Sequence, residues 1–181
     1  MSLDPMLLYR FDSRNEYPVL RSYTTVRGEV HTLVEGSGVD TRLRVLVDPE
    51  GTQPQGAVVV LALPSVAFDG TPERFELAVD GDGSGSRIML EASDARAGSF
   101  MYVLGDVDFE GVRTCCAEVL KHDDPRIGRA SSAAGSATPP IELLRLAIGL
   151  DASCRGVALG LISLAVTGRV RLVPHGLADS P

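Results

Sequence analysis

Apolar side chains recur at every second position along much of this chain, and this alternation is the strongest constraint on its fold. RLRVLVD (42–48) and RFELAVD (74–80) both show it, while the apolar run at 56–63 has the length of a central strand covered on both faces. The other segments predicted as strands are 87–93, 99–107, 112–119, 141–150, 155–166 and 170–173. Turn signals such as EGSG, FDGTP, GDGSG and TG separate them at intervals of about 8–12 residues, which is typical of an all-β antiparallel sandwich or barrel.

The chain has 181 residues, enough for one domain with a substantial core, and we expect a single β-sandwich domain over 1–181. A long loop rich in Ser, Ala, Gly and Pro is predicted at 121–140, and a short irregular tail at 174–181. Propensity alone would also allow a helix at 141–150. We interpret that segment as a strand because it follows two prolines and alternates, although imperfectly.

Charge and hydropathy disfavour a nucleic acid partner, a transmembrane segment and a signal peptide. The chain carries 17 basic and 24 acidic residues, a net charge of −7, so it would repel a phosphate backbone and we expect no nucleic acid partner. No apolar run reaches the length of a transmembrane helix, and we predict no transmembrane segment. The N-terminal MSLDPMLLYRF shows neither a basic segment nor an apolar core, so no signal peptide is visible in it.

Three cysteines have no zinc-binding or redox spacing. Cys115 and Cys116 are adjacent, so in a strand they point to opposite faces and would not bond to each other without strain. Cys154 could pair with one of them, or all three could be buried thiols. We interpret them as structural thiols.

The stretch Asp80–Glu91, DGDGSGSRIMLE, has the acidic spacing of a calcium-binding EF-hand loop. Both flanks, however, alternate with a period of two, whereas an EF-hand requires helices on both sides. A strand continuing from Ser86 would also carry Glu91 about 15 Å from the turn, too far to close a coordination sphere. We therefore predict a glycine-supported hairpin turn at Asp80–Gly83.

The run from 72 to 119 resembles the middle of galactose-binding-like jelly-roll domains of the carbohydrate-binding-module type. The matching residues are Pro72, Phe75, Leu77, Val79, Gly81 to Gly85, Ile88, Leu90, Asp94, Ala95, Gly98, Phe100, Tyr102, Leu104, Gly105, Val107, Asp108, Phe109, Gly111 and Arg113. The stretch PPIELLRLAIGLDASCRGVALGLISLAVTG is similar to the closing strands of that family. The resemblance implies a jelly-roll β-sandwich and a non-catalytic carbohydrate-binding module. Such a module would be an accessory domain of a secreted or envelope-associated enzyme, with an extracellular or cell-envelope location.

The sequence departs from that family at two places. Phe109 and Val112 stand where the family usually has tryptophan, and the chain has no tryptophan. Ile162, Ser163 and Leu164 replace an acidic pair before the last strand; in related sandwiches a carboxylate near that end helps to hold a structural calcium. Asp12 could supply one oxygen, but its acidic partner is missing. We therefore expect no cofactor, the alternative being a structural calcium.

A sugar site usually combines an aromatic platform with a few hydrogen-bonding groups. Tyr17 and Tyr23, in the weakly patterned N-terminal segment, are the best candidates for exposed aromatics, although ordinary packing is the alternative for both. Arg87 and Arg113 near strand starts could clamp an acidic sugar through bidentate bonds, the alternative being solvated strand ends. The remaining aromatics with a clear pattern, Phe75, Phe100 and Tyr102, fall at core positions.

Catalytic residues do not assemble into a recognisable set, and we expect no enzyme. His31, His122 and His175 are scattered, and no GxSxG elbow is present. Asp106 and Asp108 share a strand face at a separation that nominally suits glycoside hydrolysis, but such pairs are common in strands. The alternative to a sugar-binding module is a structural or protein-interaction β-sandwich that has lost sugar binding.

Overall fold

The computed structural model describes residues 4–12, 14–119 and 137–173. Within these residues the regular secondary structure consists of strands and one 3-10 turn at Gly38–Asp40. The strands are β1 (Met6–Arg10), β2 (Gly28–Glu35), β3 (Arg42–Pro49), β4 (Val58–Asp82), β5 (Ser86–Ser93), β6 (Ser99–Val107), β7 (Glu110–Glu118), β8 (Ile141–Gly149) and β9 (Val157–Val173). The all-β class is thus confirmed, and 141–149 is a strand. The loop predicted at 121–140 lies mostly outside the described residues, and the predicted tail at 174–181 lies wholly outside them.

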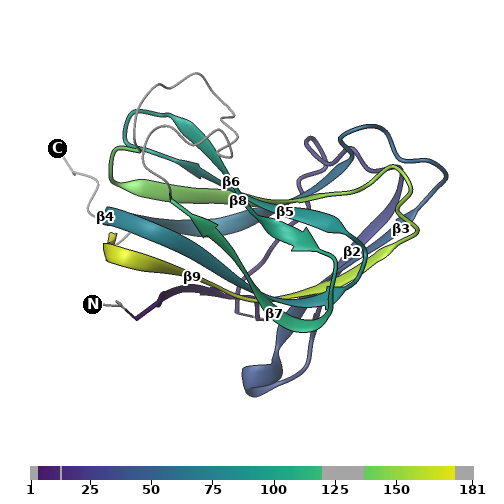
Figure 1. Cartoon of the computed structure of the whole chain (residues 1–181), viewed down its shortest axis with the longest axis horizontal. Coiled ribbons are helices and arrows are strands. Elements are labelled where there is room, and N and C mark those ends of the chain that lie inside the picture. The colour runs from purple at the N-terminus through teal and green to yellow at the C-terminus, as the bar shows by residue number, and fades with distance from the viewer. Residues whose placement is uncertain (1–3, 13, 120–136, 174–181) are drawn as a thin grey trace.

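The strands form two antiparallel layers that are joined through the long strand β4. Their order is β2-β3-β9-β4-β8-β5-β6, with β1 beside β9 and β7 beside β4. The first part of β4 pairs with β8, whereas its second part pairs with β9 and β7. One layer therefore contains the start of β4 with β8, β5 and β6, and the other contains the end of β4 with β7, β9, β3 and β2. Figure 1 shows the first group facing the second.

Two predicted chain breaks are wrong, because β4 and β9 run through them. The sequence FDGTP was predicted to separate 56–63 from 74–80, and TG to separate 155–166 from 170–173, but β4 and β9 are continuous strands of 25 and 17 residues. They bend together where Gly70 (φ +107°) and Gly168 (φ +135°) approach the opposite backbone. These glycines permit a sharp bend without ending the pairing.

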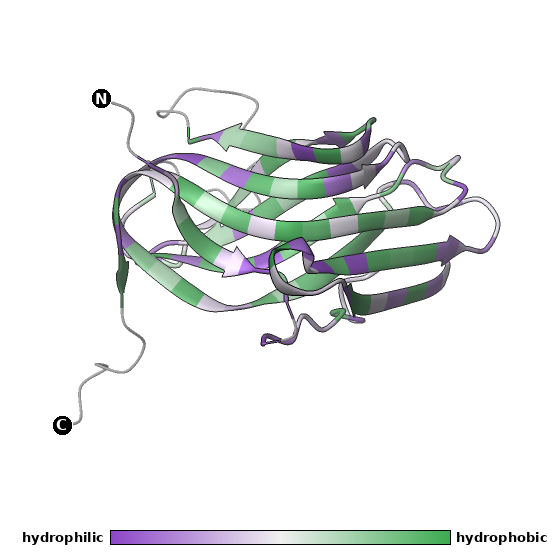
Figure 2. Cartoon of the chain, turned by 90° about the horizontal axis from the view of Figure 1, so that it is seen from below, coloured by the Kyte–Doolittle hydropathy of each residue, from purple (hydrophilic) through white to green (hydrophobic). Residues whose placement is uncertain are grey.

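The space between the layers is filled by the alternating apolar side chains. Figure 2 shows hydrophobic and hydrophilic residues alternating along the strands. Phe75, Phe100 and Tyr102 are buried as predicted. Phe75 of β4 and Tyr102 of β6 come from opposite layers, and their ring centroids lie 5.1 Å apart. These contacts confirm a sandwich core.

The cysteines behave as alternation predicts. Cys115 is buried and its neighbour Cys116 is exposed, so they occupy opposite faces of β7. Both of them, and Cys154, are free thiols. Burial raises the pKa of the Cys115 thiol, which keeps it protonated at neutral pH.

The acidic stretch that begins at Asp80 continues β4 as far as Asp82, and a turn follows at 83–85. Gly83 and Gly85 both have positive φ, and the backbone N–H of Ser84 donates to Asp82 Oδ1 at 3.0 Å. The strands on either side, β4 and β5, do not pair with each other, because the turn carries the chain from one layer to the other. A glycine-supported turn is confirmed, but it lies at 83–85 rather than at Asp80–Gly83, and the prediction of a hairpin is wrong. Within the described ranges, no helix is long and apolar enough to cross a membrane.

Candidate functional site

Tyr23 is the one aromatic side chain that the fold leaves open to solvent. All four tyrosines and five phenylalanines lie in the described ranges, and apart from Tyr23 they are buried. Tyr23 is 53% exposed. Since an aromatic platform for a sugar needs a free ring face, the choice among aromatic residues reduces to this one.

Tyr17 does not have the exposure predicted for it. It is only 5% exposed, because its ring packs against Phe11 with centroids 4.9 Å apart. Its hydroxyl donates to the carbonyl of Arg10 at 3.0 Å. Tyr17 therefore closes one edge of the core, and we withdraw it as a platform.

Backbone hydrogen bonds fix the position of Tyr23 next to the start of β4. The N–H of Leu20 donates to the carbonyl of Val60 at 2.8 Å, and the N–H of Thr25 donates to the carbonyl of Val58 at 2.9 Å. The N–H of Val60 in turn donates to Thr24 Oγ1 at 3.1 Å. The segment carrying Tyr23 therefore runs beside β4 as an irregular extension of the layer.

The Tyr23 ring lies over the guanidinium group of Arg145 on β8. The carbon at the centre of that group is 4.3 Å from the ring centroid, within the range of a cation–π contact. Arg145 is clamped by Glu91 of β5, which accepts bonds from its Nε and, at 3.0 Å, from its Nη2. Ser99 Oγ of β6 also donates to Glu91 at 2.8 Å. Three strands thus contribute to one network under the ring.

The Glu91 carboxylate is charged although its side chain is only 7% exposed. Burial would raise its pKa, but the hydrogen bonds from Arg145 and Ser99 outweigh burial and hold the pKa of Glu91 below its ordinary value. Arg145, for its part, has a raised pKa because Glu91 accepts its hydrogen bonds. The pair is a partly buried, fully charged ion pair at neutral pH.

The same layer presents a set of aligned outward side chains. The register places Arg145 opposite Ala62 and Glu91, and places Gly149, four positions along β8, opposite Val58 and Arg87. The alternate residues on these strands point inward, so Arg145, Gly149 and their partners share the outer face. The fully buried inward residues include Val59, Leu61, Ile88, Leu90, Leu146 and Ile148. The outward residues that lie in this face are Val58, Val60, Ala62, Arg87, Met89, Glu91, Met101, Val103, Asp106, Arg145, Ala147 and Gly149. We call this surface the outer face of β4–β8–β5–β6.

A hollow of about 530 Å³ lies at the Gly149 end of this face. Arg87, Met89, Asp106, Asp108 and Asp151 are among its lining residues. Arg87 donates from Nε and Nη2 to the two carboxylate oxygens of Asp106, at 2.7 and 3.1 Å, and this bidentate bond lowers the pKa of Asp106. The pair is exposed, so its outer atoms remain open to hydrogen-bond a ligand.

Two of the four predicted ligand-binding residues share this face. Tyr23 stands at one end of it and Arg87 at the other. Arg113 lies on β7 in the opposite layer, where its guanidinium packs 4.9 Å above the Phe109 ring, so the structure does not bring it to Tyr23 or Arg87. Glu91 and Arg145 were not predicted. A charged residue in the middle of each of two apolar strands is the signal of a cross-strand pair, and it was available in the sequence.

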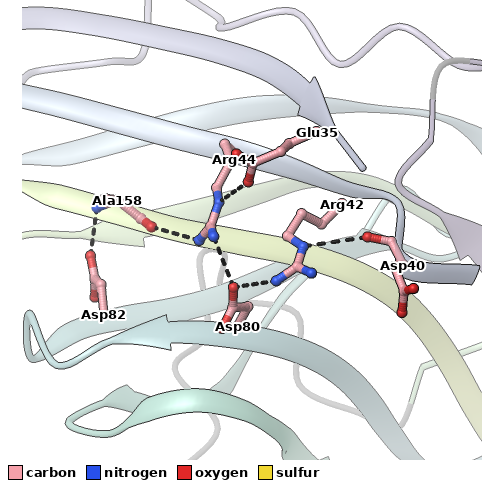
Figure 3. Close-up of polar contacts among 7 residues, drawn as sticks. All are labelled: Glu35, Asp40, Arg42, Arg44, Asp80, Asp82 and Ala158. Atoms are coloured by element: carbon pink, nitrogen blue, oxygen red, sulfur yellow. Dashed lines mark hydrogen bonds and ion pairs between the residues drawn. The ribbon is translucent and has the colours of Figure 1, made fainter. Parts of the chain in front are cut away.

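A second polar cluster lies on the opposite layer and serves the fold. Figure 3 shows the guanidinium groups of Arg42 and Arg44 converging on Asp80, at 2.5 and 3.0 Å. Arg44 also donates to Glu35 and to the carbonyl of Ala158, while Asp82 accepts the N–H of Ala158. These contacts join β2, β3, β9 and β4, and they use the acidic residues that the sequence places in the EF-hand-like stretch.

No catalytic constellation stands out in the described residues. His31 is exposed, with its Nε2 3.0 Å from the Glu29 carboxylate, and His122 and His175 lie outside the described ranges. Asp106, considered with Asp108 for glycoside hydrolysis, is bound by Arg87. In the part of the chain that the structure covers, no group of three or more His, Cys, Asp and Glu side chains could share a metal ion.

Comparison with known proteins gives similarity in structure but not in sequence. No protein-family model matches the chain, and no curated protein matches it in sequence. The family 11 carbohydrate-binding module of a cellulosomal cellulase of Clostridium thermocellum superposes with a TM-score of 0.57 at 9% identity, over 93% of this chain and 96% of the module. The module from the same organism in complex with a β-1,3-1,4-mixed-linked tetrasaccharide gives 0.58 at 11% identity, over 91% and 95%.

An exo-β-agarase is also similar, with a TM-score of 0.53 at 11% identity, over 93% of this chain and 25% of the agarase chain. At such identities the likeness concerns the fold. The two modules match along almost their whole length, which agrees with the jelly-roll sandwich that the sequence resemblance implied. The chain has the jelly-roll β-sandwich fold of carbohydrate-binding modules.

Proposed function

We propose that this chain is a non-catalytic carbohydrate-binding module that binds a glycan across the outer face of β4–β8–β5–β6. The observation that carries the proposal is Tyr23, the one exposed aromatic ring, which lies over Arg145 on this outer face. Its lower side is covered by Arg145, and the exposed fraction of the ring leaves surface on which the C–H-rich face of a sugar could stack. The fold shared with carbohydrate-binding modules supports the same function.

The dimensions of the face favour an oligosaccharide. From Arg145 to Gly149 the strand advances about 13 Å, at about 3.3 Å per residue, which is longer than one pyranose ring. Tyr23 would bind one sugar by stacking. The Arg87–Asp106 pair, together with Asp108 and Asp151, would hydrogen-bond hydroxyl groups of a sugar further along the chain.

The first ligand to test is a mixed-linkage β-glucan, because the similar module was solved with a β-1,3-1,4-linked tetrasaccharide. Agarose is the second, because of the agarase. We further propose that the module is accessory to an enzyme that is secreted or attached to the cell envelope. One of the similar modules belongs to a cellulase, which supports this setting.

Tyr23→Ala is expected to weaken glycan binding by about tenfold or more, since it removes the apolar surface on which the sugar stacks. Tyr23→Phe keeps the ring and should retain most of the affinity. The measurement is a glycan-array screen of the wild type followed by titration calorimetry of each variant with the best ligand.

Val112→Ala serves as the matched control, because Val112 is also exposed but lies on β7 in the opposite layer. It should bind as the wild type does. A folded wild type that binds no glycan would overturn the proposal in favour of the structural or protein-interaction sandwich. Equal losses for Tyr23→Ala and Val112→Ala would show that the sugar does not bind on this face.

A further inference from the structure

The Tyr23 ring would be free to rotate without a neighbour to hold it. The residue lies between β1 and β2, outside any strand, and about half of it is exposed. Backbone hydrogen bonds fix its chain segment but do not touch the ring. A ring that samples several rotamers must lose that freedom when a sugar stacks on it, and the loss weakens binding.

Arg145 supplies the contact that the ring needs. Its guanidinium group lies 4.3 Å from the Tyr23 centroid, so the two planes can stack. The guanidinium is itself immobilised, because both its Nε and Nη2 donate to Glu91 and Glu91 is anchored by Ser99. The side chains of Ser99, Glu91 and Arg145 therefore connect the Tyr23 ring to the sheet and restrict its motion.

We infer that Arg145 is a positioning residue, held by Glu91, that orients the Tyr23 ring before the ligand arrives. The inference rests on the proposed function, because orientation of the ring matters for affinity only if the ring is the platform. Arg145 would act from beneath the ring, on the side away from the sugar, and would not need to touch the ligand. Removal of Arg145 should thus lower the affinity for the glycan, but by less than removal of the Tyr23 ring.

The test is the double variant Glu91→Gln/Arg145→Gln, which removes both charges together and so leaves no unpaired buried carboxylate. Two amides of similar length can still hydrogen-bond, so the fold should be kept, and a thermal unfolding curve checks this. Affinity for the best array ligand should fall about fivefold, the size expected from loss of one cation–π contact.

The second readout needs no ligand. The protein is labelled with 3-fluorotyrosine, and the Tyr23 fluorine signal is identified by its loss in Tyr23→Phe. Because Tyr23 is the one exposed tyrosine, its fluorine relaxation reports the mobility of the free ring. The double variant should show a more mobile Tyr23 and unchanged signals from the other tyrosines.

A matched control is Asp69→Asn/Arg171→Gln, which removes another cross-strand ion pair, at the bend of β4 and β9. It should change neither readout. A folded Glu91→Gln/Arg145→Gln variant with wild-type affinity and wild-type relaxation would overturn the inference. If the wild type binds no glycan, the proposed function fails separately, and fluorine relaxation still decides whether Arg145 orders the ring.

Discussion

Gly70→Ala is expected to lower the free energy of unfolding by about 3–5 kcal/mol. At Gly70, φ is +107°, and an added Cβ would lie 2.0 Å from the carbonyl oxygen of Arg169. That oxygen belongs to β9, which pairs with β4 on both sides of the bend, so it cannot move away without breaking the strand pair. Urea unfolding of the wild type and the variant measures the difference.

Gly51→Ala separates the two causes of the stability loss in Gly70→Ala, which are the positive φ and the clash of the added Cβ with the Arg169 carbonyl oxygen. Gly51 also has positive φ (+67°), but no atom lies within 4 Å of its added Cβ. Its substitution should cost about 1–2 kcal/mol, the price of the left-handed backbone alone. If Gly70→Ala were no more costly than Gly51→Ala, β4 and β9 would not run through the bend as a continuous pair.

The continuity of β4 and β9 through this bend is the part of the fold that could not be predicted from the sequence. Alternation identified most strands because burial of one face of a sheet imposes a period of two on the residues themselves. A sequence such as FDGTP reports only that the backbone is permissive there. Whether the chain turns back or bends and continues depends on the partner strand. Here Gly70 of β4 is paired with Val170 of β9, and Gly168 of β9 is paired with Pro72 of β4. No pattern local to either segment contains that pairing.

The candidate site shows the same limit. Tyr17 and Tyr23 occur in one weakly patterned segment, and no sequence pattern distinguishes the exposure of the two rings. Phe11 covers Tyr17, whereas Tyr23 lies over Arg145, and both neighbours are set by tertiary contacts. In the sequence, Glu91 stands out only as the last position of an EF-hand-like spacing, although its actual partner, Arg145, is 54 residues away on β8. The part of the turn prediction that succeeded, a chain reversal supported by glycine near Gly83, needed only local backbone chemistry.

Removal of Arg145 alone should be much more damaging than removal of both charges. Arg145→Met leaves the Glu91 carboxylate, with a side chain 7% exposed, without its cation. Because an unpaired charge is costly to bury, we expect the free energy of unfolding at pH 7 to fall by about 3 kcal/mol. The Glu91→Gln/Arg145→Gln variant should lose clearly less, and Arg171→Met, which breaks an exposed pair, should lose little.

The free energy of unfolding that Arg145→Met loses should be larger at pH 7 than at pH 4. In the wild type the folded-state pKa of Glu91 is lowered, so its contribution to stability is present above the unfolded pKa near 4.5 and is lost as the pH falls through the lower folded value. Without Arg145, burial remains while the main lowering contact is gone, so the folded pKa rises above the unfolded one. The variant then binds a proton on folding and becomes less stable as the pH rises. Urea unfolding at pH 7 and pH 4 should therefore give a smaller difference between wild type and variant at pH 4, and an equal difference at both values would mean that Glu91 is not the group left unpaired.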